Sequence, residues 1–261
     1  MFRPCLAGFL LAMAASSAEA GAWAQPKGKG QIILKAEVMR ASRGYDGTAN
    51  LRDLPLTRKD RTVGFLGEYG LTDRVTVQLK GDWQSGEDAF VDYEGRGPVE
   101  LGLTWQAYRD TRTAVSVYGG YSLSGEGRNA GYAFPGVGEQ DWEVRLAIGH
   151  SLDGPGWRMP SGVRPDRSFI EVQAAYRGRS GLPDETRIDF TAGSHFGRKW
   201  MILGQAFGGM ARDAGPRWLS IETSVVRNLG GWSLQAGWRR TVAGRETPLS
   251  EGAVVALWRR F

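Results

Sequence analysis

The residues best suited to catalysis in this chain are two histidines, His150 and His195, and a scattering of acids. A general base must lie within hydrogen-bond reach of the proton that it removes, and the most favourable pair along the chain is His195 with Asp189. Six residues of extended strand would place these two side chains about 20 Å apart. The only cysteine is Cys5, close to the N-terminus. Neither a hydrolase nor a catalytic metal centre is therefore favoured.

Oppositely charged residues recur in pairs two positions apart. These pairs are Lys35 with Glu37, Lys80 with Asp82 and Glu143 with Arg145. Residues i and i+2 of a β-strand share a face, so each pair would project from one side of a strand. Such a face can form ion pairs with neighbouring strands, or it can line a path for a polar solute. The charged residues expected to line the interior are Lys35, Glu37, Glu68, Lys80, Asp82, Glu100, Glu143, Arg145, Glu171, Arg187, Asp189, Glu222 and Arg239.

The polar face belongs to a wider pattern of alternating side chains. Between Arg74 and Gln84, the apolar residues Val75, Val77, Leu79 and Trp83 share one parity, and the even-numbered residues are mostly polar. This period of two predicts a β-strand. The same alternation predicts about twelve strands along the chain. They are Gln31–Ser42, Arg61–Leu71, Arg74–Gln84, Pro98–Asp110, Arg112–Ser124, Gln140–Leu152, Arg167–Arg179, Thr186–Gly197, Lys199–Arg212, Arg217–Asn228, Gly231–Ala243 and Gly252–Phe261.

The N-terminal residues have the layout of a cleaved secretory signal. Arg3 precedes an apolar run from Leu6 to Ala15, and two Ala-x-Ala motifs follow, one ending at Ala20 and one at Ala24. A basic start, a short apolar run and small residues at a cleavage site are typical of an export signal. The sequence therefore predicts a signal peptide at residues 1–24 and one exported domain at residues 25–261. Cys5 would leave with the signal, and the apolar run is shorter than a membrane-spanning helix needs.

An export signal followed by an even number of alternating strands predicts an all-β fold, an antiparallel up-and-down transmembrane β-barrel of about 12 strands. The protein would pass through the periplasm to the outer membrane of a Gram-negative cell. Long and short connections alternate as such a barrel requires, with Asp153–Asp166 as an exception on the periplasmic side. The expected outer loops are Arg43–Asp60, Ser85–Gly97, Gly125–Glu139, Ser180–Glu185, Asp213–Pro216 and Gly244–Glu251.

Aromatic residues of the outward parity gather near the strand ends. A membrane barrel carries aromatic girdles at both interfaces, whereas the core of a soluble sandwich gives no reason for this distribution. Near the outer rim the expected girdle residues are Trp83, Tyr121, Trp142, Tyr176 and Trp238, and near the inner rim they are Tyr69, Trp105, Phe196, Trp232 and Phe261. Outer-membrane lipid and lipopolysaccharide would be the partners of this surface.

The last strand resembles the C-terminal signature of Gram-negative outer-membrane proteins, because it alternates and ends on Phe261. Arg259 departs from that signature, which has an apolar residue there. The resemblance implies recognition by the barrel-assembly machinery. The stretches Gly28–Gln31, Gly67–Asp73 and Gly97–Trp105 also resemble uncharacterised transporter-like barrels of the phenol meta-pathway type. That resemblance implies uptake of small molecules, and it implies no catalytic residues or cofactors.

Three functions remain open on the sequence. The first is a narrow channel that gives small solutes passive passage through a polar lumen. The second is a non-conducting structural or surface-binding barrel, whose acidic Ser85–Gly97 segment could bind Ca²⁺ or bridge lipopolysaccharide. The third and weakest is an outer-membrane hydrolase. Nucleic acid is not an expected partner, because the 33 Lys and Arg are interspersed with 28 Asp and Glu.

Overall fold

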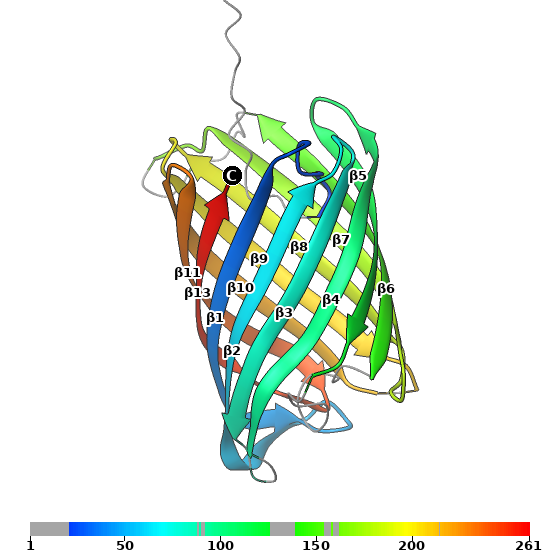
Figure 1. The fold of residues 1–261 in the computed structure, drawn as a ribbon. Coiled ribbons are helices and arrows are strands. Elements are labelled where there is room, and N and C mark those ends of the chain that lie inside the picture. Colours follow the sequence, from blue (N-terminus) through cyan, green and yellow to red (C-terminus); the bar gives the residue numbers. More distant parts are fainter. Residues whose placement is uncertain are drawn as a thin grey trace, which may run out of the picture.

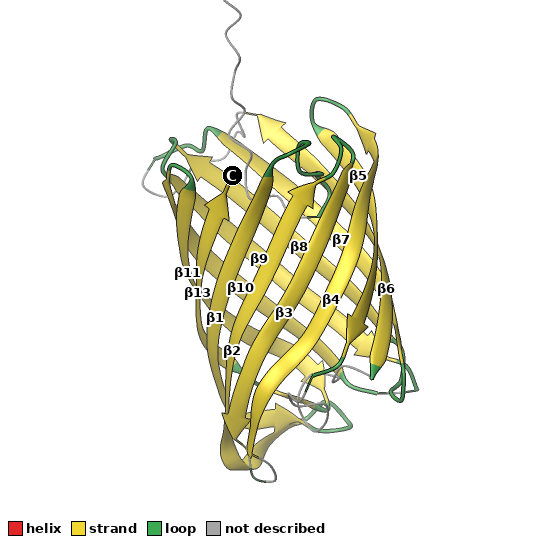
Figure 2. Ribbon diagram, in the orientation of Figure 1, coloured by secondary structure: helices red, strands yellow, loops and turns green. Residues whose placement is uncertain are grey.

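The structure is a computed structural model that describes residues 21–87, 89, 92–125, 139–153, 158, 162–213 and 215–261. Strands joined by turns and loops make up this part of the chain (Figure 2). Across the same ranges, no helix is long and apolar enough to cross a membrane. Cys5, residues 1–20 of the expected signal, most of the expected Gly125–Glu139 loop and half of the Asp153–Asp166 connection lie outside the described residues.

The described chain forms thirteen strands, of which β12 has only two residues. The strands are β1 (Gly30–Tyr45), β2 (Leu51–Gly70), β3 (Val75–Glu87), β4 (Asp92–Arg109), β5 (Thr113–Leu123), β6 (Gln140–Asp153), β7 (Arg167–Arg179), β8 (Glu185–Phe196), β9 (Trp200–Ala211), β10 (Arg217–Leu229), β11 (Trp232–Arg245), β12 (Thr247–Pro248) and β13 (Glu251–Arg260). The twelve long strands agree with the strands predicted from alternation, so the all-β barrel prediction is confirmed.

The sheet closes on itself into a barrel (Figure 1). Every neighbour in the order β1 to β11 pairs antiparallel with the next, and β13 pairs with both β11 and β1. At this last seam, the amides and carbonyls of Gly30 and Phe261 exchange two hydrogen bonds of 3.0 Å. Closure satisfies the backbone groups that an edge strand would leave unpaired. It also brings Gly30 and the C-terminus to the same end of the barrel.

Two expected outer loops are largely strand, and those predictions are corrected. The expected Arg43–Asp60 loop shortens to a tip between Tyr45 and Leu51, because β1 and β2 pair almost to their ends. The expected Ser85–Gly97 loop is likewise mostly β3 and β4, paired as far as Glu87 with Asp92. Most residues of the β2 extension are exposed. In these extensions neither face of the strand packs against other groups, so the sequence shows no alternation of apolar residues. The backbone hydrogen bonds between the strands nevertheless continue.

Side chains of the two parities separate into an outer and an inner face. The apolar residues predicted to point outward are exposed, with Val63 at 57%, Leu101 at 59% and Ile221 at 47%. The inner face carries most of the buried polar residues, including Glu68, Glu143 and Glu222. The inside of the barrel is therefore the place where charged side chains of different strands meet.

Candidate functional site in the barrel interior

One group of charges in the interior joins β1, β10 and β11. Lys35 Nζ lies 2.9 Å from Glu37 Oε1 and 3.5 Å from Glu222 Oε2. Arg239 contacts the same two acids, because its guanidinium lies 3.1 Å from Glu37 and 2.7 Å from Glu222. The Glu222 side chain is fully buried, whereas Lys35 is 27% exposed. These four residues form a closed group in which each charge has two opposite partners.

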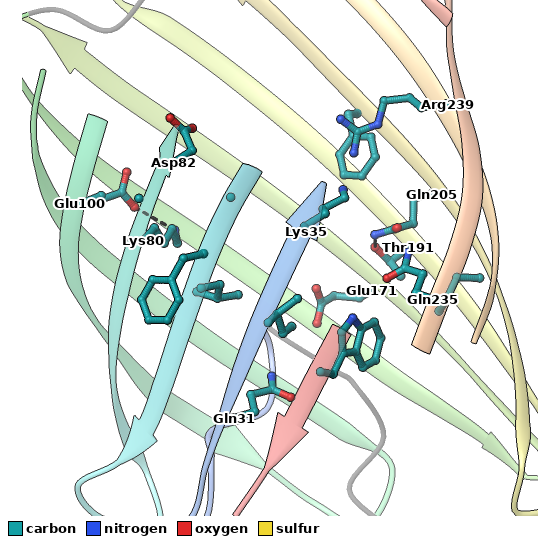
Figure 3. A pocket seen from close by; sticks show the side chains of 18 of the residues that line it. Gln31, Lys35, Lys80, Asp82, Glu100, Glu171, Thr191, Gln205, Gln235 and Arg239 are labelled. Carbon is teal, nitrogen blue, oxygen red and sulfur yellow. Dashed lines mark hydrogen bonds and ion pairs between the residues drawn. The ribbon is translucent and has the colours of Figure 1, made fainter. Parts of the chain in front are cut away.

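A second group of charges lies on β3 to β7. Glu100 accepts a hydrogen bond from Lys80 Nζ at 2.8 Å and one from Arg177 at 3.1 Å. Arg177 also contacts Glu143 at 2.7 Å, and Glu143 in turn contacts Arg145 at 2.6 Å. The dashed line in Figure 3 joins Lys80 to Glu100. Arg177 of β7 therefore links the charges on β3 and β4 to those on β6.

A third set of charges extends this ladder along β7 and β8. Glu185 pairs with Arg187, and its second oxygen lies 3.3 Å from Arg179. Arg187 and Asp189 border a hollow of about 230 Å³ that Arg239 also lines. Most of these charges therefore form ion pairs, some within one strand and others between strands, and ion pairing is one of the two roles that the sequence predicts for this face.

Amide and carboxylate groups fill the interior near the end where the termini lie. Glu68 of β2 accepts hydrogen bonds from Gln31 at 2.6 Å, Gln78 at 2.9 Å and Gln25 at 3.1 Å. Glu68 is 4% exposed. Gln25 precedes the first strand, so part of the chain ahead of the barrel reaches into it.

Residues 21–25 form a strap inside this end of the barrel, which we call the N-terminal strap. Ala22 donates its amide to Glu171 at 2.9 Å, and its carbonyl accepts from Gln106 at 3.0 Å and Ser116 at 2.6 Å. Trp23 packs edge-on against Phe169, with ring centroids 6.2 Å apart. These contacts reach strands β4, β5 and β7 across the interior. The strap therefore narrows the mouth of the barrel at this end.

An apolar patch lines the interior beside the strap. Its buried members are Phe169, Met201, Leu203, Val226, Ala256 and Trp258, and Trp23 and Ile33 pack against them. Met201, Leu203 and Phe207 share the inner face with Gln205, so the interior is not uniformly polar.

Between the charged groups and the apolar patch lies a cavity of about 510 Å³. Figure 3 shows Asp82, Lys80 and Glu100 around one part of it, and Arg239, Gln205 and Gln235 around another. Ile33, Leu203 and Trp258 supply apolar lining. Alternation did not predict this apolar lining, because apolar residues at every second position have the same pattern whether they face inward or outward. The only signal in the sequence lies in Lys199–Arg212, where Met201, Leu203 and Phe207 share a parity with Gln205.

The predicted interior residues come from many strands and fall into separate groups. Lys35, Glu37, Glu222 and Arg239 form one group, and Lys80, Glu100, Glu143 and Arg145 another. Glu68 and Glu171 lie beside the strap. Asp82 is apart from the ion pairs and accepts a hydrogen bond from Gln84 at 3.0 Å.

The predicted girdle residues lie on the outer face of the barrel, and most of them are well exposed. Tyr69, Trp83, Trp105, Tyr121, Trp142, Trp232, Trp238 and Phe261 are 43–54% exposed. Tyr176 is half-buried, because its ring packs against Trp142 and its hydroxyl donates to Asp184. Arg259, the residue that departs from the C-terminal signature, lies over the Trp232 ring at 5.0 Å.

The two histidines have packing contacts. His195 is 7% exposed and lies beside Phe169, with ring centroids 6.5 Å apart. His150 Nδ1 lies 2.9 Å from the Thr113 hydroxyl. Over the described ranges, no three His, Cys, Asp or Glu residues come together as metal ligands.

Comparison with solved structures places this architecture among known barrels. The chain is similar to the COG4313 outer membrane channel from Pseudomonas putida F1, with a TM-score of 0.65, 14% identity and coverage of 94% of this chain and 100% of the other. The fold is that of an outer-membrane β-barrel. The KdgM porin in complex with disordered oligogalacturonate matches this barrel at a TM-score of 0.52 and 5% identity, over 88% of this chain and 99% of the porin.

The NanC porin is a further similar barrel, with a TM-score of 0.53, 6% identity and coverage of 87% of this chain and 98% of the porin. No family model and no curated protein matches the sequence. These likenesses establish the fold of the outer-membrane barrel. The narrower resemblance to barrels of the phenol meta-pathway type stays a prediction.

Proposed function

We propose that this protein is an outer-membrane channel that gives small solutes passive passage through a narrow lumen. The cavity of about 510 Å³ inside the closed barrel carries this proposal. Its charges occur as paired acids and bases, so a strong preference for one sign of ion is not expected. The similar solved structures are channels and porins, which supports passage in general.

The N-terminal strap sets the width of the path in this proposal. Ala22 and Gln25 bind side chains of β2 to β7, and Trp23 occupies the space over Gly149. A solute that crosses the barrel must pass the strap or displace it. Passage is therefore expected to be narrow while the strap is bound and wide when it is absent.

Conductance of the purified protein in a planar lipid bilayer tests the channel. The intact protein is expected to show small discrete openings, and a variant that lacks residues 21–25 is expected to show larger ones. Arg240→Gln is the matched control, because Arg240 is an exposed residue outside the interior. Silence of both the intact and the shortened protein, with correct folding, would overturn the proposal and favour a structural barrel.

A further inference from the structure

The first described residues are held inside the barrel by buried polar groups. Ala22 is fully buried, and three side chains from three strands bind its amide and carbonyl, namely those of Glu171, Gln106 and Ser116. All three partners are at most 3% exposed. Buried polar groups need such partners, so the strap is part of the folded barrel. This position conflicts with an export signal that ends at Ala24, because cleavage there would remove Ala22 and Trp23.

We propose that signal peptidase cleaves this chain between Ala20 and Gly21, and that the new terminal ammonium of Gly21 pairs with the buried carboxylate of Glu171. Hydrolysis adds one water across the Ala20–Gly21 peptide bond. It leaves a carboxylate on Ala20 and an ammonium group on Gly21. The Ala-x-Ala motif that ends at Ala20 suits this cleavage, and the motif that ends at Ala24 lies inside the fold.

Gly21 lies beside the Glu171 carboxylate. A Cβ atom added at Gly21 would lie 2.7 Å from Glu171 Oε1 and would overlap the Gln173 amide. The φ of Gly21 is 127°, a backbone conformation that favours glycine. Glu171 is 3% exposed and accepts hydrogen bonds from the Ala22 amide and the Gln173 side chain. Cleavage after Ala20 would place a positive charge one residue before the amide that already binds Glu171.

The mass of the mature protein tests the cleavage position. The full precursor is expressed in a Gram-negative host, purified from the outer membrane, and analysed by intact mass and N-terminal sequencing. The expected first residue is Gly21. A chain that begins at Gln25, or one that retains residues before Gly21, overturns the proposal. This result does not depend on conductance, so its failure is distinct from failure of the channel.

The reactivity of the terminal amine tests the ion pair. An amine-reactive reagent is applied to the folded protein, and labelling of Gly21 is followed by mass spectrometry. A nearby carboxylate favours the charged form of an amine and raises its pKa by about one unit, which lowers the reactive, uncharged fraction about tenfold. Labelling is therefore expected to be slow in the natural sequence and about tenfold faster in Glu171→Gln. Equal labelling rates in both proteins would overturn the pairing.

Glu37→Gln is the matched control for this experiment. Glu37 is also an interior glutamate, but its partners are Lys35 and Arg239 rather than the strap. The same loss of one negative charge at Glu37 is expected to leave the labelling rate of Gly21 unchanged. An equal acceleration by both substitutions would show a general loosening of the barrel and would overturn the specific role of Glu171.

Discussion

At the scale of single residues, the strap depends on a few positions that leave room for it. Gly149 of β6 lies beneath Trp23, and a Cβ atom there would overlap the indole ring. On the other side of the barrel mouth, a Cβ at Gly70 would overlap the backbone of Gln25 and Pro26. These glycines accept a close approach of other groups, which is a common use of glycine in strands.

Gly149→Val is expected to displace Trp23 and loosen the strap. A side chain at residue 149 and the indole ring cannot occupy the same space, so single-channel conductance should rise toward that of the strap deletion. Gly119→Val is the matched control, because a Cβ at Gly119 meets nothing within 4 Å. Wild-type conductance of a folded Gly149→Val protein would contradict a role for Trp23 in narrowing the path.

Asp46 organises the tip between β1 and β2. Its Oδ1 accepts from the amides of Thr48 and Asn50, both at 2.9 Å, and from the Thr48 hydroxyl at 2.7 Å. Arg52 donates to its other oxygen at 3.0 Å. The hydrogen bond from the Thr48 hydroxyl, with those from Asn50 and Arg52, lowers the pKa of Asp46 below its usual value of 3.8.

The order of this tip is expected to depend on pH. Because the pKa of Asp46 is lower in the folded state, its stabilising effect is present above pH 3.8 and is lost as the pH falls through the depressed pKa. The protection of the Thr48 and Asn50 amides, measured as their exchange rate relative to that of an unfolded peptide at the same pH, should therefore fall in acid. Asp46→Ala should show fast exchange already at neutral pH. Exchange that does not respond to either change would contradict this role.

At the scale of the strand, β11 carries two arginines with different environments on opposite faces. Arg239 points inward to Glu37 and Glu222, and its guanidinium also lies 4.7 Å from the Phe207 ring. Arg240 points outward, is 53% exposed, and lies 3.5 Å from Glu251. The period of two places neighbouring residues of one strand in environments of different polarity.

Arg239→Gln is expected to lower the free energy of unfolding by about 3 kcal/mol, because it leaves the buried Glu222 carboxylate with fewer opposite charges. Arg240→Gln should cost about 1 kcal/mol or less, as exposed ion pairs do. Urea unfolding in lipid vesicles measures both. Equal losses in the two variants would show that the inward ion pairs contribute no more than the outward one.

At the scale of the whole molecule, the barrel is completed by the seam between β1 and β13. Gly30 and Phe261 exchange backbone hydrogen bonds there, and a Cβ at Gly30 would lie 2.9 Å from the Phe261 ring. The last residue of the chain thus packs against the first residue of β1. Closure requires the start of β1 and the C-terminal residue to lie at the same end of the barrel.

Phe261→Ala is expected to reduce the amount of folded barrel in the outer membrane, because it removes the ring that covers Gly30 at the seam. Phe190→Ala is the control, since Phe190 is an outward phenylalanine on β8, away from the seam. Heat-modifiable migration on gels measures the folded fraction in membranes. An equal reduction by both variants would contradict a special role of the C-terminal residue.

The sequence by itself determined the strands and their faces. Alternation is a local property, because each strand has its own period of two, and residues such as Val75, Val77 and Leu79 show it without reference to their neighbours. It also identified most interior charges, including Glu68, Glu143 and Arg239. The observed strands exceed their predicted length most at the β1–β2 tip, where backbone hydrogen bonds continue although the strands have no apolar face there.

Only the tertiary structure decided which of these groups meet. Lys35 reaches Glu222 across the β1, β13, β11 and β10 order, and the register between strands that sets this contact leaves no trace in any one segment. The inward patch around Phe169 and Leu203 was hidden for a similar reason, because apolar residues have one pattern whether they face outward or inward. The sequence places Ala22 and Trp23 within the predicted signal of residues 1–24, and it gives no indication of their contacts with Glu171 and Phe169 inside the barrel. Its place depends on partners up to 149 residues away, and closure of the sheet is what brings them together.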